Sequence, residues 1–232
     1  MKSVIVILLI QLFFVEVGAH AQKLDRKSDP FQNPFANPTD DSKLPRVLLI
    51  GDSISISYTT RVRIQLKDKA TVHRPKTNCR WSAFGAEHID EWVGDGKWDV
   101  IHFNFGLWDW YGWQQPEKAT PASYAASLEK IVQQLMKTDA HLIFAITTPP
   151  CVGPERKVKI VVSEKRSKEF NDAALKVMNT HGVEINNLYE VIGGQRRQYQ
   201  LAENDVHYND AGKDVLAAAV TEKIMAALRG KK

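Results

Sequence analysis

Hydrophobic and polar positions follow two different patterns along this chain, and together these patterns predict most of its secondary structure. Short, unbroken apolar runs are typical of strands that are buried on both faces. The stretches between them carry apolar residues every three or four positions, as one face of a helix does; in 121–138 these are Leu128, Ile131, Val132 and Leu135. The predicted strands are 47–50, 71–73, 98–105, 141–147 and 183–185. The predicted helices are 54–66, a turn or two in 85–93, 121–138, 163–181 and a last helix from about Asn209 to Leu228.

The alternation of strands and helices predicts an α/β fold, in which a parallel sheet carries helices on both faces. We expect a single three-layer α/β/α domain over residues 46–232, with a mainly parallel, flavodoxin-like sheet of about five strands. A segment of about 187 residues is long enough for one sizeable domain and too short for two.

The first 45 residues differ in composition from the rest. Lys2, an apolar stretch at 4–15 and the small residues around Ala21 follow the order of a secretory signal peptide. The apolar stretch is too short to span a bilayer comfortably. We therefore predict a signal peptide at 1–21, cleaved after Ala21, and a secreted or periplasmic protein with no stable membrane span; an uncleaved anchor or a buried first helix is the alternative. Residues 22–45, rich in proline and polar residues, are predicted to be a disordered linker.

Charge and cysteine content exclude several function classes. The formal net charge is only +4 and the basic residues are scattered, so the sequence indicates no nucleic-acid partner. His, Cys, Asp and Glu residues form no cluster with metal-ligand spacing, and neither a metal nor another cofactor is predicted. Cys79 and Cys151 could form a disulfide in an oxidising compartment, and the sequence leaves this pairing open.

Two residues far apart in the sequence suggest nucleophilic catalysis. Ser53 follows the first strand through Gly51 and begins the first predicted helix. This position presents a hydroxyl at the carboxyl edge of the sheet, beside helix N–H groups that favour developing negative charge. His207, near the end of the chain, supplies the kind of base that a serine hydroxyl needs. A helix N-cap serine and a surface histidine are the alternative interpretations.

The motifs Ile50-Gly51-Asp52-Ser53 and Asp205-Val206-His207-Tyr208-Asn209 resemble the GDSL/SGNH family of serine esterases and acetylhydrolases, over about residues 46–228. The resemblance implies the SGNH hydrolase fold, with Ser53 as nucleophile and His207 as general base. The family places an aspartate three residues before the histidine, where this chain has Asn204, while Asp205 lies two residues before it. We favour Asp205 as the residue that orients His207, and leave Asn204 or a Ser–His dyad open.

The oxyanion hole departs further from the family pattern. The family's third block is Gly-x-Asn-Asp, whereas this chain has Gly106-Leu107-Trp108-Asp109. Trp108 could donate through its indole N–H, and Asn104, in the similar variant block Asn-x-Gly-x-Trp, is the other candidate. The second block should provide a glycine; Gly85 fits by residue type, although Asn78-Cys79-Arg80 lies closer to the end of the second strand. The Ser53 backbone N–H is the remaining predicted donor.

The aromatic residues after the third strand complete the functional prediction. Trp108, Trp110 and Trp113 are predicted to bind substrate by stacking on sugar rings or covering an acyl group, with core packing as the alternative for about half of the aromatics. The sequence thus predicts an exported serine esterase that hydrolyses small acyl esters, with O-acetyl groups on carbohydrate as the favoured substrates. A lysophospholipase or thioesterase, an O-acyltransferase and a non-catalytic SGNH-like binding module are the alternatives. A long apolar tunnel would favour the first of these, and Ser53 and His207 pointing apart would favour the last.

Overall fold

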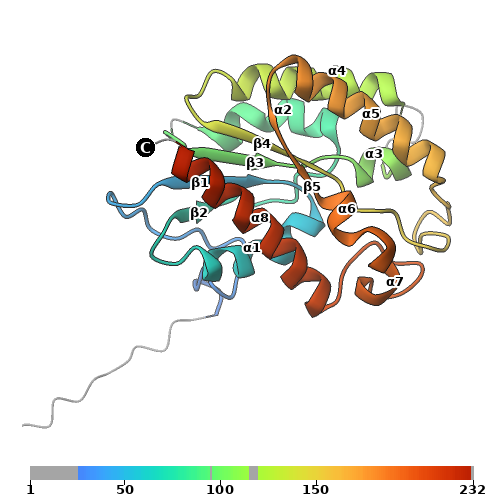
Figure 1. Ribbon diagram of the computed structural model, residues 1–232, viewed down its shortest axis with the longest axis horizontal. Coiled ribbons are helices and arrows are strands. Elements are labelled where there is room, and N and C mark those ends of the chain that lie inside the picture. Colours follow the sequence, from blue (N-terminus) through green and yellow to red (C-terminus); the bar gives the residue numbers. More distant parts are fainter. Residues whose placement is uncertain (1–25, 95, 115–119, 231–232) are drawn as a thin grey trace, which may run out of the picture.

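Five parallel strands form the centre of the computed structural model, which describes residues 26–94, 96–114 and 120–230 (Figure 1). They lie in the order β2-β1-β3-β4-β5, which is the order of flavodoxin-like sheets. Every neighbouring pair is parallel. The strands are β1 (Arg46–Ile50), β2 (Thr71–His73), β3 (Val100–Phe103), β4 (His141–Ile146) and β5 (Glu184–Asn187). The predicted α/β fold is therefore confirmed, whereas the predicted signal peptide, residues 1–21, lies outside the described residues.

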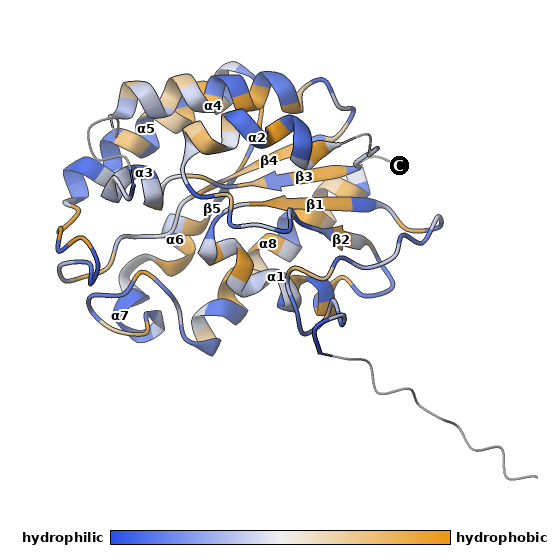
Figure 2. Ribbon diagram, turned by 180° about the vertical axis from the view of Figure 1, so that it is seen from behind, coloured by the Kyte–Doolittle hydropathy of each residue, from blue (hydrophilic) through white to orange (hydrophobic). Residues whose placement is uncertain are grey.

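Helices cover both faces of this sheet, which gives the three layers that the alternation predicts (Figure 1). One face carries α2 (Ser82–Val93), α4 (Pro121–Leu135) and α5 (Glu164–Thr180), and the other carries α1 (Ser53–Gln65) and α8 (Asp210–Gly230). Hydrophobic residues concentrate in the strands and on the inward sides of the helices (Figure 2). Residues 47–50 of β1 are completely or almost completely buried, as a strand covered on both faces must be.

Side chains next to the strands and helices fix where several helices begin. Asp52 caps α1 by accepting the Ile54 N–H at 2.9 Å. Thr120 and Ser123 form a reciprocal capping box at the start of α4, and Ser163 caps α5. Such caps satisfy N–H groups that have no acceptor within the helix. They explain why the predicted starts of these helices lie close to the observed ones.

Short elements differ more from the prediction. The helices α3 (Leu107–Tyr111), α6 (Leu188–Ile192) and α7 (Arg196–Tyr199) and the 3₁₀ turn Gly193–Gln195 are present in the structure but were not predicted. Helix α2 begins three residues before the predicted turn at 85–93, and the ladder of β3 covers only part of the predicted strand 98–105. One helical turn has no repeating apolar spacing, so the pattern of the sequence does not indicate it.

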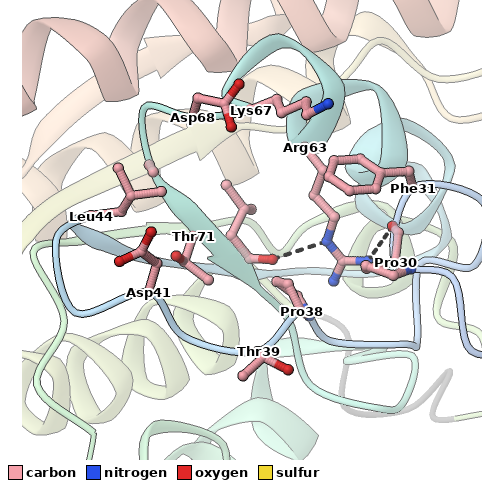
Figure 3. Close-up of a pocket in the computed structure, with 12 residues that line it drawn as sticks. Pro30, Phe31, Pro38, Thr39, Asp41, Leu44, Arg63, Lys67, Asp68 and Thr71 are labelled. Carbon is pink, nitrogen blue, oxygen red and sulfur yellow. Dashed lines mark hydrogen bonds between the residues drawn. The ribbon is translucent and has the colours of Figure 1, made fainter. Parts of the chain in front are cut away.

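Residues 26–45 pack against the domain, in contrast to the disordered linker expected for 22–45, of which residues 22–25 lie outside the described range. The buried Arg63 of α1 donates through Nη1 to the carbonyl oxygens of Pro30, Asn33 and Ala36, at 2.8, 3.1 and 3.0 Å. Figure 3 shows this guanidinium directed toward Pro30. The low apolar content of the segment predicts disorder, whereas these contacts are made by its backbone carbonyl groups.

A second group of contacts holds the end of the same segment. Asp40 lies 3.1 Å from Arg46 Nε and 2.7 Å from His73 Nε2, and the Asn37 side chain accepts the Arg74 N–H at 3.0 Å. A cavity of about 170 Å³ lies between the segment, the end of α1 and β2 (Figure 3). The ordered domain therefore begins before residue 46.

Three further features bear on the sequence predictions. Cys79 and Cys151 are both buried and both unpaired, so the disulfide left open by the sequence is not formed. No helix in the described ranges is long and apolar enough to cross a membrane. Within the same ranges, no group of three or more His, Cys, Asp or Glu residues is arranged to hold a metal ion.

Candidate active site

Ser53, His207 and Asp205 form a continuous chain of hydrogen-bonding groups at the carboxyl edge of the sheet. His207 Nε2 lies 2.9 Å from Ser53 Oγ, although the two residues are 154 positions apart. His207 Nδ1 lies 2.6 Å from Asp205 Oδ1. When the Nδ1–H donates a hydrogen bond to this carboxylate, Nε2 is unprotonated and its lone pair can accept the Ser53 hydroxyl proton.

The turn before α1 is built to present Ser53. Gly51 leaves no room for a side chain, since an added Cβ would lie 2.8 Å from Ser55 Cβ. Asp52 is buried beneath the turn, and burial raises the pKa of its carboxyl to about 6, although the Ile54 N–H and the charges of His207 and Arg74 act in the opposite direction. Arg74, itself buried, donates to the Gly51 carbonyl oxygen at 3.2 Å. The buried side chains of Asp52 and Arg74 therefore hold the turn in place, while Ser53 remains partly exposed.

Asp205 is held as an ionised, buried carboxylate. Its Oδ1 also accepts the backbone N–H of His207 at 3.0 Å, and its Oδ2 lies 2.9 Å from Arg156 Nη1. Burial acts to raise the pKa of Asp205, but the hydrogen bonds from His207 and the charges of His207 and Arg156 outweigh it and hold this pKa below its usual value. Asn204 is exposed, and its backbone carbonyl accepts the Arg156 N–H at 3.0 Å. The structure thus joins Asp205, rather than Asn204, to His207.

A cavity of about 320 Å³ opens beside Ser53 and His207. Part of its wall comes from the segment between β4 and α5. There the buried Glu155 accepts hydrogen bonds from the indole N–H of Trp113 and from the backbone N–H groups of Lys157 and Val158. The residues lining the cavity are Ser53, Asn78, Trp108, Trp113, Gln114, Glu155, Lys157, Val158, Val206 and His207.

Two of the predicted oxyanion donors lie elsewhere, which corrects the sequence-based expectation. The Gly85 N–H is inside α2 and donates to the Trp81 carbonyl oxygen at 3.0 Å. An added Cβ at Gly85 would lie 2.4 Å from Phe105 Cζ, so this glycine serves close packing of α2. The Asn104 side chain donates to the Ala145 carbonyl oxygen at 2.7 Å and does not line the cavity.

Asn78 takes the place at the cavity that Gly85 was expected to occupy. Its Oδ1 accepts the Arg80 N–H at 2.9 Å, which leaves the amide nitrogen as the possible donor to a ligand. Arg80 has a φ of 54°, a left-handed conformation that is uncommon for a residue with a side chain. The sequence indicated this only through position, since residues 78–80 follow the second strand more closely than Gly85 does.

The three tryptophans of the aromatic cluster have different environments. Trp108 and Trp113 line the cavity with ring centroids 5.3 Å apart, in an edge-to-face arrangement. Trp110 is only 1% exposed and packs near Tyr189, so the prediction that it binds substrate is wrong. Residues two positions apart on a helix point roughly 200° apart, and α3 therefore directs Trp108 and Trp110 to opposite sides.

Asp109 connects two helices near the site, a role that was not predicted from the sequence. This buried side chain accepts the Ser82 hydroxyl at 2.6 Å and also the Ser82 N–H, and it thereby ties α3 to the start of α2. Burial raises the pKa of Asp109 to about 7, against the lowering effect of these hydrogen bonds. The signal available in the sequence was the position of Asp109, three residues after Gly106, as in the third block of the family.

Residues 49–215 match the sequence model of the GDSL-like lipase/acylhydrolase family. The chain belongs to this family. The match covers more than two thirds of the sequence and includes the Ser53 and His207 motifs, so the predicted family and the predicted class, a hydrolase acting on ester bonds, are confirmed. None of the curated proteins matches this GDSL-like chain.

Solved structures of GDSL-like and related esterases share its fold at low identity. The lipase/acylhydrolase from Enterococcus faecalis is 19% identical with a TM-score of 0.63, and the match covers 78% of this chain and 95% of the other. The acetyl xylan esterase AlAXEase is 16% identical with a TM-score of 0.64, covering 77% and 99%. The carbohydrate acetylesterase Est24 from Sinorhizobium meliloti is 15% identical with a TM-score of 0.62, covering 78% and 99%.

Proposed function

We propose that this GDSL-family protein is an exported serine esterase that hydrolyses small acyl esters through Ser53, His207 and Asp205. The observation that carries the proposal is the Asp205–His207–Ser53 chain, with distances of 2.6 and 2.9 Å, at the edge of a cavity. The second distance lies within the ~2.6–3.2 Å reach that direct proton transfer needs. It argues against a non-catalytic binding module, in which these groups would have no reason to stay aligned.

The reaction follows from which atoms hold protons. Ser53 Oγ attacks the ester carbonyl carbon while its proton moves to His207 Nε2, and Asp205 stabilises the imidazolium that results. His207 then returns the proton to the leaving alcohol as the C–O bond breaks, which leaves an acyl group on Ser53. A water molecule attacks this acyl-enzyme in the same way and releases the acid and free Ser53.

The carbonyl oxygen becomes negative in the tetrahedral intermediate and needs donors. The Ser53 N–H belongs to the first turn of α1, where N–H groups have no acceptor within the helix and the helix dipole favours an anion. The Asn78 amide and the Trp108 indole line the same cavity and are the side chains best placed to add a donor. Loss of one such donor typically lowers kcat ~10²–10³-fold.

The cavity favours a short acyl group next to a polar alcohol. Its volume of about 320 Å³ lies at the lower end of the ~300–1,000 Å³ range of small-molecule sites, and Asn78, Gln114 and Lys157 interrupt its apolar walls. Such a cavity gives no support to a lysophospholipase with a long acyl tunnel. Trp108 and Trp113 offer ring surfaces suited to sugars, and two proteins of this fold are described as acetyl xylan and carbohydrate acetyl esterases. We therefore propose O-acetyl groups on carbohydrate as the substrates.

Hydrolysis of p-nitrophenyl acetate tests the mechanism. Ser53→Ala and His207→Ala are expected to lower kcat/KM ~10³-fold or more, and Asp205→Asn ~10²–10⁴-fold, because the imidazole loses its orienting carboxylate. Asn204→Ala is the matched control and should retain activity, since only its backbone contacts the site. A fluorophosphonate should label Ser53 of the wild-type protein. Absence of both labelling and turnover would refute the proposal.

Two further measurements address the substrate and the export. The ratio of kcat/KM for p-nitrophenyl acetate to that for the octanoate ester should exceed one, and acetylated xylan should release acetate. For export, mass spectrometry of protein expressed in a secreting host should give an N-terminus at Gln22, after cleavage behind Ala21. A retained N-terminus at Met1 would contradict a cleaved signal peptide.

A further inference from the structure

The geometry points to Arg156 as a positioning residue, which holds the Asp205 carboxylate toward His207 and connects it to the wall of the substrate cavity. This inference rests on the proposed serine esterase mechanism. Arg156 lies in the segment between β4 and α5, beside the basic residues Lys157 and Lys159. It does not line the cavity itself, so it would act through Asp205.

The two oxygens of Asp205 have separate partners. Oδ1 accepts both the Nδ1–H and the backbone N–H of His207, at 2.6 and 3.0 Å, while Oδ2 is 2.9 Å from Arg156 Nη1. The carboxylate side chain is 7% exposed and that of Arg156 is 49% exposed. A largely solvated guanidinium thus covers the otherwise buried oxygen of the carboxylate, and removing it would leave a buried charged atom without a donor.

The short spacing between Asp205 and His207 explains why the second oxygen needs a partner from elsewhere. With one residue between them, a single tight turn brings both N–H groups of His207 to Oδ1, and Oδ2 is left facing away from the turn. The terminal torsion of an aspartate side chain has a broad minimum and does not fix the plane of the carboxylate. A third contact, from Arg156, is therefore needed to hold that plane.

The same segment is attached to the His207 turn by its backbone and faces the cavity with its neighbouring side chains. Gly153 N–H donates to the Glu203 carbonyl oxygen at 2.6 Å, and Arg156 N–H donates to that of Asn204 at 3.0 Å. Lys157 and Val158, the next two residues, line the cavity. A substrate that contacts Lys157 and Val158 therefore touches the same segment that carries Arg156, the residue in contact with the Asp205 carboxylate.

The effect of Arg156 on the pH profile follows from the charges around the His207–Asp205 pair. Asp52 approaches from the turn before α1, and Glu155, Arg156 and Lys157 from the β4–α5 segment. Arg156 is the cation in direct contact with Asp205. Without it, the negative carboxylate favours a protonated imidazole more strongly, so the acid limb of kcat/KM should move to higher pH.

The test compares Arg156→Gln, Arg156→Lys and the control Arg197→Gln, which breaks the exposed ion pair between Arg197 and Glu203 on a neighbouring segment. Arg156→Gln should lower kcat for p-nitrophenyl acetate about 10- to 100-fold, with a smaller effect on KM, and should move the acid limb upward. Arg156→Lys should restore most of the rate and the position of the limb. The control should behave as wild type. An unshifted limb, or a loss that lysine does not restore, would overturn the assignment.

A readout without turnover separates this inference from the proposed function. The proton shared between His207 Nδ1 and Asp205 gives a downfield resonance in ¹H NMR spectra, and Arg156→Gln should shift or broaden it whether or not esters are hydrolysed. If wild type is inactive but this change is seen, the positioning role stands and the proposed reaction fails. If wild type is active and the resonance is the same in Arg156→Gln, the positioning role fails and the reaction stands. Urea unfolding of each variant checks that the fold is retained.

Discussion

Gly85 illustrates how packing can fix a single residue near a site without giving it a part in the chemistry. A Cβ at this position would lie 2.4 Å from Phe105 Cζ and 3.2 Å from Ile131 Cδ1, inside a fully packed core. We predict that Gly85→Ala lowers the free energy of unfolding by about 1–3 kcal/mol through overpacking. The better helix propensity of alanine, worth about 1 kcal/mol, should not offset this. Urea unfolding measures the loss.

The activity of this variant distinguishes packing from catalysis. Because the Gly85 N–H is bonded within α2, kcat of folded Gly85→Ala should stay within about twofold of wild type. The double variant with Phe105→Leu should recover part of the stability, since the smaller side chain makes room. A kcat loss of ~10²-fold at unchanged stability would instead support the oxyanion role first predicted for Gly85.

At the scale of elements, Arg63 determines whether the N-terminal segment 26–45 belongs to the domain. Burial lowers the pKa of this guanidinium to about 10, so it remains a cation at neutral pH while donating to three carbonyl groups of the segment. We predict that Arg63→Met lowers the free energy of unfolding by about 2–3 kcal/mol. It should also release the segment, so that limited proteolysis cuts first within 26–45.

Arg61, two residues earlier on α1, provides the matched control. It pairs with Asp210 and Asp214 at the surface, where ion pairs contribute about 0–1 kcal/mol. Arg61→Met should therefore leave the proteolytic pattern and most of the stability unchanged. Equal protease sensitivity in the two variants would argue against a specific role for the buried guanidinium.

The elements also mark the limit of what the sequence could predict. Strands such as 47–50 and helices such as 121–138 can be recognised from the local sequence, because they carry enough apolar repeats or a strong enough cap. The segment 26–45 cannot, because it is held by its own backbone carbonyl groups, which accept from Arg63, and by the polar side chains of Asn37 and Asp40. Neither composition nor spacing displays such contacts. The five-residue helix α3 is also too short to show an apolar repeat in the sequence. Without this helix, the opposite directions of Trp108 and Trp110 could not be predicted.

At the scale of the whole molecule, the site collects residues from the segments that follow each of the five strands. Ser53 follows β1, Asn78 follows β2, Trp108 follows β3, Val158 follows β4 and His207 follows β5. Ligand sites of open parallel sheets lie at the carboxyl edge of the sheet, and this is why motifs after strands could be recognised from the sequence. Choosing among side chains within each loop needs their local conformation. Gly85 was therefore preferred to Asn78, and Arg156 received no predicted role.

The pH dependence of stability is also a property of the whole molecule, because buried groups contribute with opposite signs. Burial raises the pKa of Asp109 from 3.8 to about 7, so the folded protein binds more protons than the unfolded chain between these values. Its contribution to stability is complete below about pH 4 and is lost as the pH rises through 7. His102 acts oppositely: burial lowers its pKa from 6.5 to about 4, and its contribution is lost as the pH falls.

A difference measurement isolates Asp109 from these opposing groups. Asparagine keeps an oxygen for the Ser82 hydroxyl but does not titrate, so the stability of Asp109→Asn relative to wild type should rise by on the order of 1–3 kcal/mol from pH 4.5 to pH 8. The measurement is urea unfolding of both proteins across this range. Ser82→Ala is the control, because it removes the hydrogen bond and keeps the carboxyl group, and it should show no such rise. A difference between Asp109→Asn and wild type that is constant with pH would mean that Asp109 is already ionised in the folded protein at pH 4.5, despite its burial.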